Sequence, residues 1–582
     1  MQLSILELSS LLNSFLSKKA KIKLMLATLI QIVASLLDFL GILLFGILGL
    51  LIVSPYALNS DSTVMARLFQ ATFLPELSLR RQAVVVGISV IVLFTFRSGI
   101  TLFVTKRTNR FLVSYSSNFA AKMMTDLFQL NLDLLRKFKS QEISVYLLSG
   151  VNSLFVRFLG SGFVLIGDVF LILVIFLGLS ALNSLTAFLA IILFGVMAKI
   201  VYRLSHGNVS DSSETDLRES IRANSRVIEM FRGYKELKVF GSYGKYVDEV
   251  RMSKLNSTKA VVNLNLLPVI NKALFEIFTF ICMFSFGAIV FAVFSQEEAV
   301  GQLSVFLAAT SRLAPAFLRL QQSFLTLKAS SVGASAAVDL YRQIKIAQDE
   351  FKMTGEVEDL NKNSKFSDVV IEFDGVSLIS DGEHVLRDID LLVRKGERIA
   401  IIGESGAGKS TILDLMMGLR SPTSGTVLLS NRRPIEILNQ QSVKIGFVPQ
   451  AVTIMASSLR ENVVLGRKNI SDDQVIAALM AANLHQILDE CSWNLDLKVG
   501  EQGRIISGGE AQRVGVARAL VGNPEFLFLD EATSSLDEEN KKMVIDSISA
   551  LPRSVTIVAI THSLDLWPTF DKNILIKDKT VI

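Results

Sequence analysis

Cysteine, histidine and charge are all scarce in this chain. Only two cysteines, Cys282 and Cys491, and four histidines occur among its 582 residues. The two cysteines stand far apart, which excludes a disulfide framework and a zinc site built on paired cysteines. Charged residues make up 19% of the chain, and the net charge is only +5. Because no basic face is clustered in the sequence, we expect no nucleic-acid partner.

Apolar residues, in contrast, are abundant. They make up 50% of the chain, and the mean hydropathy is positive. A soluble chain of this length rarely has such a composition, so a membrane protein is favoured. The apolar excess is confined to residues 1–330, and the remainder has the composition of a globular domain.

Six apolar runs are long enough to cross a membrane, because a spanning helix needs about 20 such residues. The runs cover residues 24–53, 83–105, 158–181, 183–205, 270–294 and 301–328. No small-residue cleavage site follows a short apolar core at the N-terminus, so we interpret the first run as a retained helix. The sequence therefore predicts an α-helical transmembrane domain with six spans.

Basic residues flank these runs on one side. Lys18 to Lys23 precede the first run, and Lys106 and Arg107 follow the second. The positive-inside rule then places the N-terminus and the C-terminal domain in the cytoplasm. The long inner connections, 106–157 and 206–269, have helical apolar spacing. We expect their turning points, near 132–140 and 232–243, to contact the C-terminal domain.

Composition changes again after the last run. Residues 331–365 pass from Ala and Ser to a polar stretch and are predicted to form a linker. From residue 366 to 582 strand and helix patterns alternate, which indicates an α/β domain. The predicted organisation is a transmembrane domain over 1–330, a linker over 331–365 and an α/β P-loop domain over 366–582.

The strongest local motif is G-x-x-x-x-G-K-[ST] at residues 403–410, between a strand pattern and a helix pattern. Backbone N–H groups of such a loop surround phosphates, and the following helix N-terminus favours negative charge. Lys409 is expected to neutralise the β- and γ-phosphates, and the Ser410 hydroxyl to bind Mg²⁺. The ATP-binding residues predicted here are Gly403, Glu404, Ser405, Gly406, Ala407, Gly408, Lys409, Ser410 and Thr411.

A second motif places two acids after four apolar residues. The run 526–529 reads as a buried strand, and Asp530 and Glu531 follow it directly. Ligands bind at the carboxyl ends of the strands in α/β sheets. Asp530 is therefore expected to bind Mg²⁺, and Glu531 to polarise the attacking water.

The order of the motifs resembles the ATP-binding cassette of ABC transporters over about 210 residues. The P-loop is followed by Val448-Pro449-Gln450, Ser507-Gly508-Gly509, Asp530-Glu531, Ser535-Leu536-Asp537 and Thr561-His562. The six spans and the long inner connections resemble the exporter branch of that family. The resemblance implies ATP and Mg²⁺ as cofactors and ATP hydrolysis coupled to transport.

The resemblance also implies roles for single residues. Gln450 would bind Mg²⁺ and water and couple them to the membrane domain, and His562 would be the switch histidine. Asp537 would lie in the D-loop. The signature residues Ser507, Gly508 and Gly509 would contact the γ-phosphate of ATP held by a partner cassette. One chain then has two incomplete half-sites, so a homodimer is expected.

Two positions depart from the family pattern. Glu510 stands where the signature usually has Gln, which adds a carboxylate near phosphate. Ser380 stands where an aromatic residue normally stacks on adenine, and His384 is a candidate replacement. The sequence therefore does not decide which residue contacts the adenine base.

Ionisable residues also occur inside the apolar runs, where each costs roughly 2.5–3.5 kcal/mol at the bilayer centre. They are Asp38, Arg97, Asp168, Glu276, Arg312 and Arg319. One interpretation is intramembrane pairing, for example of Arg97 with Asp38, or snorkelling toward the interface. The other is that Arg97, Arg312 and Arg319 line the transport path, since guanidinium groups suit phosphate.

The sequences Phe96-Arg97 and Arg312 to Arg319, with Pro315 between the latter two, resemble the bacterial lipid-linked oligosaccharide flippases. This resemblance implies a multi-pass protein of the bacterial inner membrane. It would move a polyprenyl-phosphate- or pyrophosphate-linked glycan from the inner to the outer leaflet, in contact with membrane lipid. A multidrug, lipid or peptide exporter is the alternative, and an ATP-gated channel or regulator is the alternative of another class.

Overall fold

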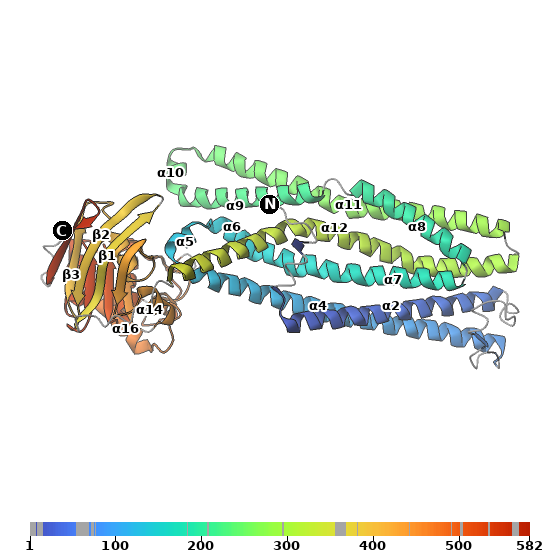
Figure 1. Cartoon of the computed structure of the whole chain (residues 1–582), viewed down its shortest axis with the longest axis horizontal. Helices are drawn as coiled ribbons and strands as arrows, with labels where there is room; N and C mark the ends of the chain where they lie inside the picture. The colour runs from blue at the N-terminus through green and yellow to red at the C-terminus, as the bar shows by residue number, and fades with distance from the viewer. Residues whose placement is uncertain are drawn as a thin grey trace. The chain divides into compact units, whose positions relative to one another are not determined.

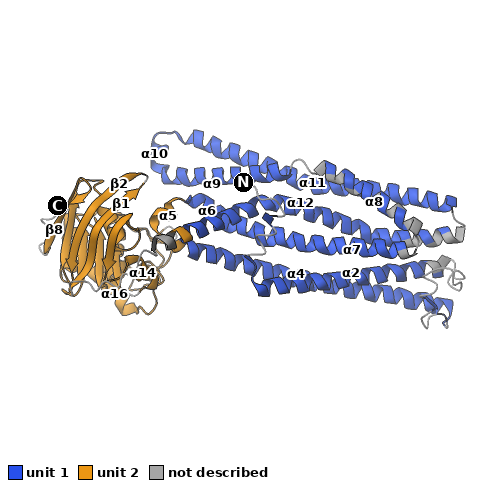
Figure 2. Ribbon diagram, in the orientation of Figure 1, with its two compact units in different colours: residues 1–127, 138–348 blue, residues 128–137, 349–582 orange. Residues whose placement is uncertain are grey.

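A computed structural model gives the structure of the chain. It describes residues 7–8, 15–53, 69–70, 75, 77–182, 184–205, 209–293, 296–355, 368–380, 382–441, 443–490, 492–500, 504–533, 536–561 and 570–582. The chain forms two compact units (Figure 2). Unit 1 comprises residues 1–127 and 138–348, and unit 2 comprises residues 128–137 and 349–582.

Unit 1 is built from helices, most of them long, and the long ones run alongside one another (Figure 1). They are α2 (Lys18–Val53), α4 (Leu79–Phe128), α6 (Ser140–Val145), α7 (Gly160–Leu182), α8 (Ser184–Ser205), α9 (Val209–Arg232), α10 (Tyr234–Val239), α11 (Tyr243–Val293) and α12 (Gln296–Gly355). Two π-helical segments, η3 (Tyr146–Gly150) and η4 (Ser153–Leu159), join α6 to α7. As expected, the described parts of both inner connections are mainly helical.

Four helical segments among the described residues are long and apolar enough to cross a membrane. They are Lys18–Gly49, Leu79–Phe128, Ser140–Ser180 and Tyr243–Val293. They contain or overlap the first, second, third and fifth predicted runs. The other two runs lie in α8 and α12, which are helical but are not among these four. In α12, Arg312, Arg319 and several polar side chains interrupt the apolar pattern.

The interior of unit 1 is aromatic where its helices meet. Phe194, Phe286 and Phe306 are fully buried in one cluster with side chains of α2, α7 and α12. The rings of Phe286 and Phe306 stack with centroids 3.8 Å apart. Outward-facing positions are also apolar, since Ile91 is 67% exposed and Phe284 is 82% exposed. Exposed side chains of this size suit hydrocarbon rather than water.

Unit 2 contains two sheets. An antiparallel sheet has the order β2-β1-β4, and a six-stranded sheet has the order β5-β6-β7-β3-β8-β9. The strands are β1 (Val369–Ser380), β2 (Glu383–Arg394), β3 (Arg398–Gly403), β4 (Ser424–Leu429), β5 (Ile445–Val448), β6 (Phe526–Asp530), β7 (Thr556–Ile560), β8 (Lys572–Lys577) and β9 (Thr580–Val581). Strands β5, β6, β7, β3 and β8 are parallel, as their buried apolar sequences indicate.

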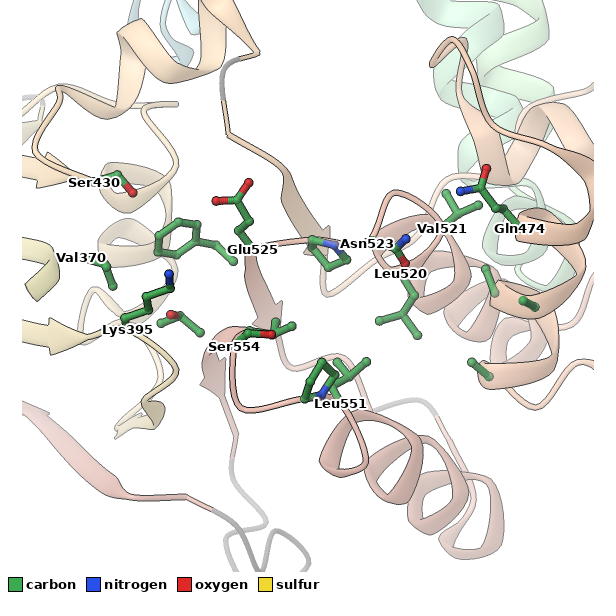
Figure 3. A pocket seen from close by; sticks show the side chains of 18 residues that line it. Val370, Lys395, Ser430, Gln474, Leu520, Val521, Asn523, Glu525, Leu551 and Ser554 are labelled. Carbon is green, nitrogen blue, oxygen red and sulfur yellow. The ribbon is translucent and has the colours of Figure 1, made fainter. Parts of the chain in front are cut away.

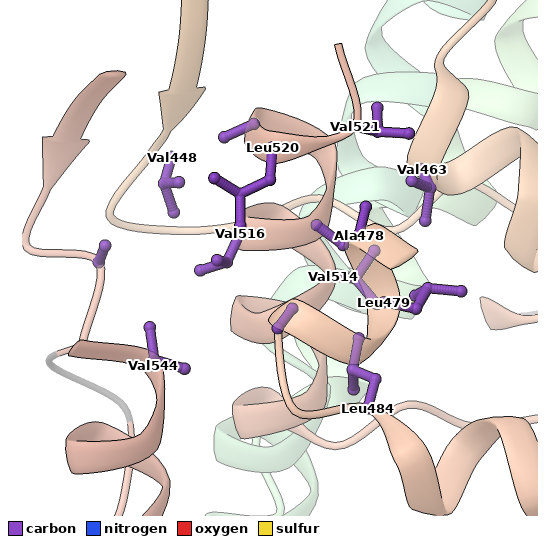
Figure 4. Packing of buried hydrophobic residues seen from close by; sticks show 14 of the residues in the cluster. Val448, Val463, Ala478, Leu479, Leu484, Val514, Val516, Leu520, Val521 and Val544 are labelled. Carbon is purple, nitrogen blue, oxygen red and sulfur yellow. The ribbon is translucent and has the colours of Figure 1, made fainter. Parts of the chain in front are cut away.

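Unit 2 also contains helices. They are α5 (Leu132–Arg136), α13 (Lys409–Met416), α14 (Pro434–Gln440), α15 (Leu459–Val464), α16 (Asp472–Ala481), α17 (His485–Glu490), α18 (Gly508–Leu520) and α19 (Glu538–Ser549). One core lies between the two sheets and α13. A second core joins α15, α16 and α18 to β5, with Val448, Leu479 and Val516 pointing inward (Figure 4).

The segment interpreted as a linker begins as a helix. Helix α12 continues through the predicted boundary at residue 330 and ends only at Gly355. The alanines and serines at its start are buried, as Ala334 and Ala337 are 0% exposed. Small side chains there allow close helix packing, because a Cβ added to Gly150 would lie 3.1 Å from Ala337 Cβ. The small residues therefore serve packing within unit 1.

The turn between β2 and β3 requires glycine and sets the start of the P-loop strand. Gly396 has φ +77°, and a Cβ there would lie 2.0 Å from the carbonyl oxygen of Arg553. The Gly396 N–H donates to Thr556 Oγ1 at 2.9 Å. Gly382, at the β1–β2 turn, has φ +81°, but no atom lies within 4 Å of the place that a Cβ would occupy there.

We expect Gly396→Ala to lower the free energy of unfolding by about 2–5 kcal/mol, because strain and a backbone clash add. The matched change Gly382→Ala has only the conformational cost of about 1 kcal/mol. Thermal unfolding midpoints of the purified chain would show this order. Equal midpoints for the two variants would contradict the tight packing of the turn.

Candidate functional site

Four neighbouring strands end at one edge of the parallel sheet, and each leads into a predicted site segment. The order β5-β6-β7-β3 puts the P-loop after β3 next to the strand that ends before Thr561. Asp530 and Glu531, at the end of β6, lie one strand further from the P-loop than β7 does. Gln450 follows β5, the strand beyond β6. The register pairs Asp530 with Ile560 across β6 and β7. Parallel pairing thus brings together residues that are far apart in the sequence.

The P-loop curves back on itself before α13. Gly406 has φ +81° and Gly408 has φ +100°, which is backbone that favours glycine. A Cβ at Gly408 would lie 2.8 Å from Leu386 Cδ2, so β2 packs directly on the loop. Lys409 Nζ donates to the carbonyl oxygens of Gly403 at 2.8 Å and Glu404 at 2.9 Å. The ammonium group is therefore held within the loop that would surround the phosphates.

Two hydrogen bonds join the P-loop helix and the segment after β5 to the acids. Ser410 Oγ donates to Asp530 Oδ1 at 3.2 Å. Gln450 Nε2 donates to Glu531 Oε2 at 3.0 Å. The structure therefore brings together the residues that the sequence predicts for Mg²⁺ binding and for water activation.

These side chains fit a magnesium ion that shares its coordination with phosphate. Ser410, Gln450 and Asp530 offer hydroxyl, amide and carboxylate oxygens, the donors Mg²⁺ prefers. No group of three or more His, Cys, Asp or Glu side chains suited to a metal occurs among the described residues. A site completed by phosphate and water oxygens is the arrangement expected when the protein supplies few ligands.

The two acids differ in backbone conformation. Glu531 has φ +48°, in the left-handed region, while its N–H donates to Ile560 O at 3.1 Å. Such a conformation costs of order 1–3 kcal/mol in a non-glycine residue and is concentrated at functional sites.

Burial raises the pKa of Asp530, and the hydrogen bond from the Ser410 hydroxyl opposes that rise.

The signature segment begins helix α18. Ser507 caps the helix: its Oγ accepts from the Glu510 N–H at 3.3 Å, and Glu510 Oε2 accepts from the Ser507 N–H at 2.8 Å. Gly508 has open space where a side chain would stand, and Gly509 has only Leu536 nearby. In α18, Gln512 Nε2 donates to Pro449 O at 3.3 Å, which ties the signature helix to the segment before Gln450.

The negative charge of the Glu510 carboxylate is compensated by groups of the same chain. Arg504, which the sequence analysis did not single out, donates to Glu510 Oε1 at 3.0 Å. Burial raises the pKa of the Glu510 carboxyl, but the bonds from Ser507 and Arg504 outweigh it and the net shift is downward. The carboxylate is thus occupied by the start of its own helix.

Three further residues that the sequence singled out, Asp537, Ser380 and His384, have contacts of their own in the cassette. Asp537 caps α19 by accepting from the Asn540 N–H at 2.8 Å, a bond that lowers the pKa of its carboxyl. Ser380 pairs with Glu383, and Ile379 with His384, across the β1–β2 turn. The buried His384 Nδ1 has no hydrogen-bond partner among the described residues. His562 and Ser535 lie outside the described residues.

Three arginines of the membrane domain meet two aspartates. Arg97 pairs with Asp38 at 2.6 Å, and Arg312 lies 3.9 Å from the same carboxylate. Arg319 binds Asp168 through Nε at 3.1 Å and Nη2 at 2.7 Å. The pairing of Arg97 with Asp38 that the sequence suggested is present. The cluster contains three positive and two negative groups.

Arg312 is the least paired of the three guanidinium groups. It also lies over the ring of Phe94, 3.7 Å from the ring centroid. Its side chain is 29% exposed, whereas Asp38 is 0% exposed. The Phe94 ring contacts the face of the guanidinium group, and the Asp38 carboxylate is 3.9 Å away and shared with Arg97. The N–H donors of Arg312 are therefore largely available for an anionic group.

One cavity of unit 2 lies away from the predicted chemistry. It has a volume of about 700 Å³ and opens among Lys395, Glu525, Leu551 and Ser554 (Figure 3). Phe526 and Thr556, which also line it, are the first residues of β6 and β7. The cavity is therefore at the amino ends of these strands, opposite the edge that carries Asp530 and Glu531.

Comparison with known proteins agrees with the geometry of the cassette. Residues 386–534 match the model of the ABC transporter family. The chain is 34% identical over 215 residues to a putative multidrug export ATP-binding/permease protein of Staphylococcus aureus, covering 36% of this chain and 37% of that protein. It is 36% identical over 217 residues to multidrug resistance protein 1 of Entamoeba histolytica, covering 36% of this chain and 16% of that protein.

The fold comparison covers nearly the whole chain. A bacterial Atm1-family ABC exporter with ATP bound superposes with a TM-score of 0.68 at 20% identity, over 97% of this chain and 95% of that chain. The chain therefore combines an ABC transporter ATPase domain with the fold of an ABC exporter. The chain spans little more than a third of the length of the Staphylococcus relative.

Asp414, on the P-loop helix, gives the cassette a pH-dependent stability. Burial raises its pKa from 3.8 to about 6, against the opposing charge of Arg420. The folded state then binds an extra proton between pH 4 and 6, so this group's contribution to stability falls as pH rises through that window.

We expect Asp414→Asn to raise stability at pH 7.5 by on the order of 2 kcal/mol and to leave it nearly unchanged at pH 4. Unfolding midpoints at the two pH values would measure this difference. The exposed Asp489 provides a control, since Asp489→Asn should shift both midpoints equally. A flat difference for Asp414→Asn would show that its carboxyl is not destabilised by burial.

Proposed function

We propose that this chain is half of an ATP-driven membrane exporter that works as a homodimer. The observation that carries the proposal is the pair of hydrogen bonds Ser410–Asp530 and Gln450–Glu531 at one edge of the parallel sheet. They occur in a chain whose fold is that of an ABC exporter. The proposed domains are a six-span membrane domain over 1–330, a linker over 331–365 and the cassette over 366–582.

In this proposal each residue at the carboxyl ends of the parallel strands has a distinct role. The loop 403–411 surrounds the ATP phosphates with backbone N–H groups, and Lys409 moves from the loop carbonyls to the phosphates. Ser410, Gln450 and Asp530 would hold Mg²⁺, which neutralises charge on the phosphate oxygens. Glu531 accepts a proton from the attacking water, and Gln450 keeps its carboxylate oriented. His562 is assigned to the γ-phosphate side.

A second copy of the chain would complete each site. Ser507 and Glu510 satisfy each other at the start of α18, and open space at Gly508 permits close approach of a phosphate. The helix N-terminus favours that negative group. We assign Ser507, Gly508, Gly509 and Asp537 to the ATP bound by the partner cassette.

Glu531→Gln in the full chain, reconstituted in lipid, should reduce Mg²⁺-dependent ATP hydrolysis by at least about 100-fold, because the amide cannot accept the proton of water. ATP binding should persist, since Lys409 and the loop are unchanged. The exposed Glu538 on α19 provides a matched control, and Glu538→Gln should hydrolyse ATP at the parent rate. Hydrolysis that survives in Glu531→Gln would contradict the proposed catalytic role.

For the cargo we propose an amphiphile with an anionic head, and a lipid-linked oligosaccharide as the class that fits best. Three guanidinium groups against two carboxylates leave net positive charge in the cluster, and Arg312 has donors to spare. A polyprenyl phosphate or pyrophosphate would supply the missing negative charge. The proposed location is the bacterial inner membrane, with transport from the inner to the outer leaflet.

A multidrug exporter is the second candidate. The names of the relatives from Staphylococcus and Entamoeba favour it, and the buried Phe194, Phe286 and Phe306 offer an aromatic interior. Those names rest on matches that cover 36% of this chain, whereas the case for an anionic cargo rests on Arg312 of the membrane domain. The Gln450–Glu531 pair supports hydrolysis, which a channel gated by ATP binding would not need.

We expect Arg312→Gln to reduce flipping of a fluorescent polyprenyl pyrophosphate in liposomes by roughly tenfold, from the loss of charge-assisted bonds. Basal ATP hydrolysis should stay within about twofold because the cassette is untouched. Lys272→Gln on α11, which removes an exposed cation of the membrane domain, is the control. Unchanged flipping, or equal loss of transport of a cationic dye, would contradict an anionic cargo while leaving ATP-driven export in place.

A further inference from the structure

Helix α2 begins beside the inner part of α4 (Figure 1). Lys23 Nζ lies 5.1 Å from the centroid of the Phe111 ring. The Tyr115 hydroxyl accepts from the Ser17 N–H at 3.1 Å and donates to Phe15 O at 2.9 Å. These contacts join two segments that are far apart in the sequence, so packing fixes the start of α2 against α4.

The α4 side of this contact is packed into the interior of unit 1. The centroid of the Tyr115 ring lies 5.2 Å from that of Phe155 in η4, which is 0% exposed. The Phe119 ring lies 5.1 Å from Phe155 and 5.1 Å from Tyr341 of α12. Aromatic rings at such separations attract one another and leave little freedom to move. The surface beside Lys23 therefore has a defined geometry.

Cationic side chains gather on both sides of this contact without acidic partners. Those within five residues of Lys23 on α2 or of Phe111 on α4 form a cationic junction: Lys18, Lys19, Lys21, Lys23, Lys106, Arg107 and Arg110. All are exposed, and no described residue forms an ion pair with any of them. The segments 17–37 and 79–125 contain no Asp or Glu. The positive charge of the cationic junction is thus uncompensated along the two helices.

Exposed apolar side chains adjoin the cations on both helices. On α2, Lys23 shares a helix face with Leu26 and Ile30, which are 53% and 41% exposed. On α4, Phe103 is 64% exposed and stands one turn before Arg107. A phospholipid presents the same sequence of chemistry, with a phosphate at the membrane surface and acyl chains in the hydrocarbon core.

Membrane orientation alone does not account for this arrangement. The positive-inside rule explains cations at this end of both helices, but not packing that brings them together without a carboxylate. Arg107 and Phe111 are one turn apart, so Arg107 lies on the side of α4 that carries the ring beneath Lys23. Like charges repel, and the repulsion grows beside an apolar surface. An anion bound between the two helices would remove it.

We propose that the cationic junction is a binding site for an anionic phospholipid of the inner leaflet. Its phosphate lies between Lys19 and Lys23 of α2 and Arg107 and Arg110 of α4. The arginines offer paired donors for phosphate oxygens, and the lysines add compact positive charge. The acyl chains lie along the apolar side chains that adjoin the cations. Those side chains favour a lipid over a free phosphate ion, and the bound lipid ties the start of α2 to α4.

The test measures which lipid contacts α2 beside the cationic junction. Leu26→Trp places an indole there, and the full chain is reconstituted in mixtures of phosphatidylcholine and phosphatidylglycerol, one of them brominated. Quenching of the indole by the brominated lipid gives the relative affinity of the two lipids at this place. The emission of the chain without the reporter, which comes from Trp493 and Trp567, is subtracted.

With the Leu26→Trp reporter we expect phosphatidylglycerol to bind about tenfold more tightly than phosphatidylcholine, because several cations act on one phosphate. In the fourfold variant Lys19→Gln/Lys23→Gln/Arg107→Gln/Arg110→Gln the preference should fall below about twofold. The unfolding midpoint of each variant shows whether it is folded. Should the fourfold variant not fold, Lys23→Gln/Arg107→Gln replaces it, with an expected loss of about threefold.

Two control variants and a second reporter separate a site from general attraction. Lys19→Arg/Lys23→Arg keeps both charges and should keep the preference. Arg80→Gln/Arg81→Gln removes two exposed cations at the other end of α4 and should also keep it. Phe284→Trp, at an 82% exposed position of α11, should report nearly equal affinities for the two lipids.

A preference below twofold in the parent would overturn the inference, as would a preference that survives removal of the cations. An equal preference at the Phe284→Trp reporter would also overturn it, because attraction would then be general. Unlabelled polyprenyl pyrophosphate is added as a competitor. If one tenth of the amount of brominated phosphatidylglycerol displaces that lipid, a phospholipid is not the occupant and the cations serve the cargo instead. ATP hydrolysis enters none of these measurements, so the proposed export is tested separately.

Discussion

The parallel alignment of β5, β6, β7 and β3 is the constraint on which the nucleotide site depends. It places the carboxyl ends of all four strands at one edge, so that Ser410 reaches Asp530 across 120 residues of sequence. Reversal of any one strand would carry its residue to the opposite edge, about five residues and some 16 Å away. The cavity at the amino ends of β6 and β7 lies on that opposite side. Hence the direction of the strands, rather than the presence of a cavity, locates the candidate site.

Charge burial imposes a second constraint in the membrane domain. Asp38 is fully buried, and removal from water is tolerable only because Arg97 and Arg312 lie beside it. These pairs tie α2 to α4 and α12, while Arg319 and Asp168 tie α12 to α7. The arginines therefore hold helices together whatever else they do. Of the three arginines, Arg312 has the most N–H donors left over, because it lies 3.9 Å from a carboxylate that it shares with Arg97.

Much of the cassette could be predicted from the sequence, because its chemistry is carried by short motifs next to buried strands. Lys409, Asp530 and Glu531 lie where strand and helix patterns placed them. The length of α12 could not be inferred, since Ala- and Ser-rich segments suit both linkers and close helix packing. Arg420 and Asp133 were also missed, because an ion pair that spans 287 residues leaves no local pattern. The concern raised by Glu510 was resolved only by the side-chain geometry of Arg504.

Two physical routes lead from the nucleotide edge to the rest of the chain, and they differ in stiffness. Gln450 follows β5 in a loop, and its neighbour Pro449 is joined to α18 by a single hydrogen bond from Gln512. The route through α13 is a helix of about 12 Å that ends in a glycine turn with no room for adjustment. A loop can absorb a small displacement by rotating a few dihedral angles, whereas a packed helix and a bidentate ion pair pass it on. The α13 route is therefore the stiffer of the two.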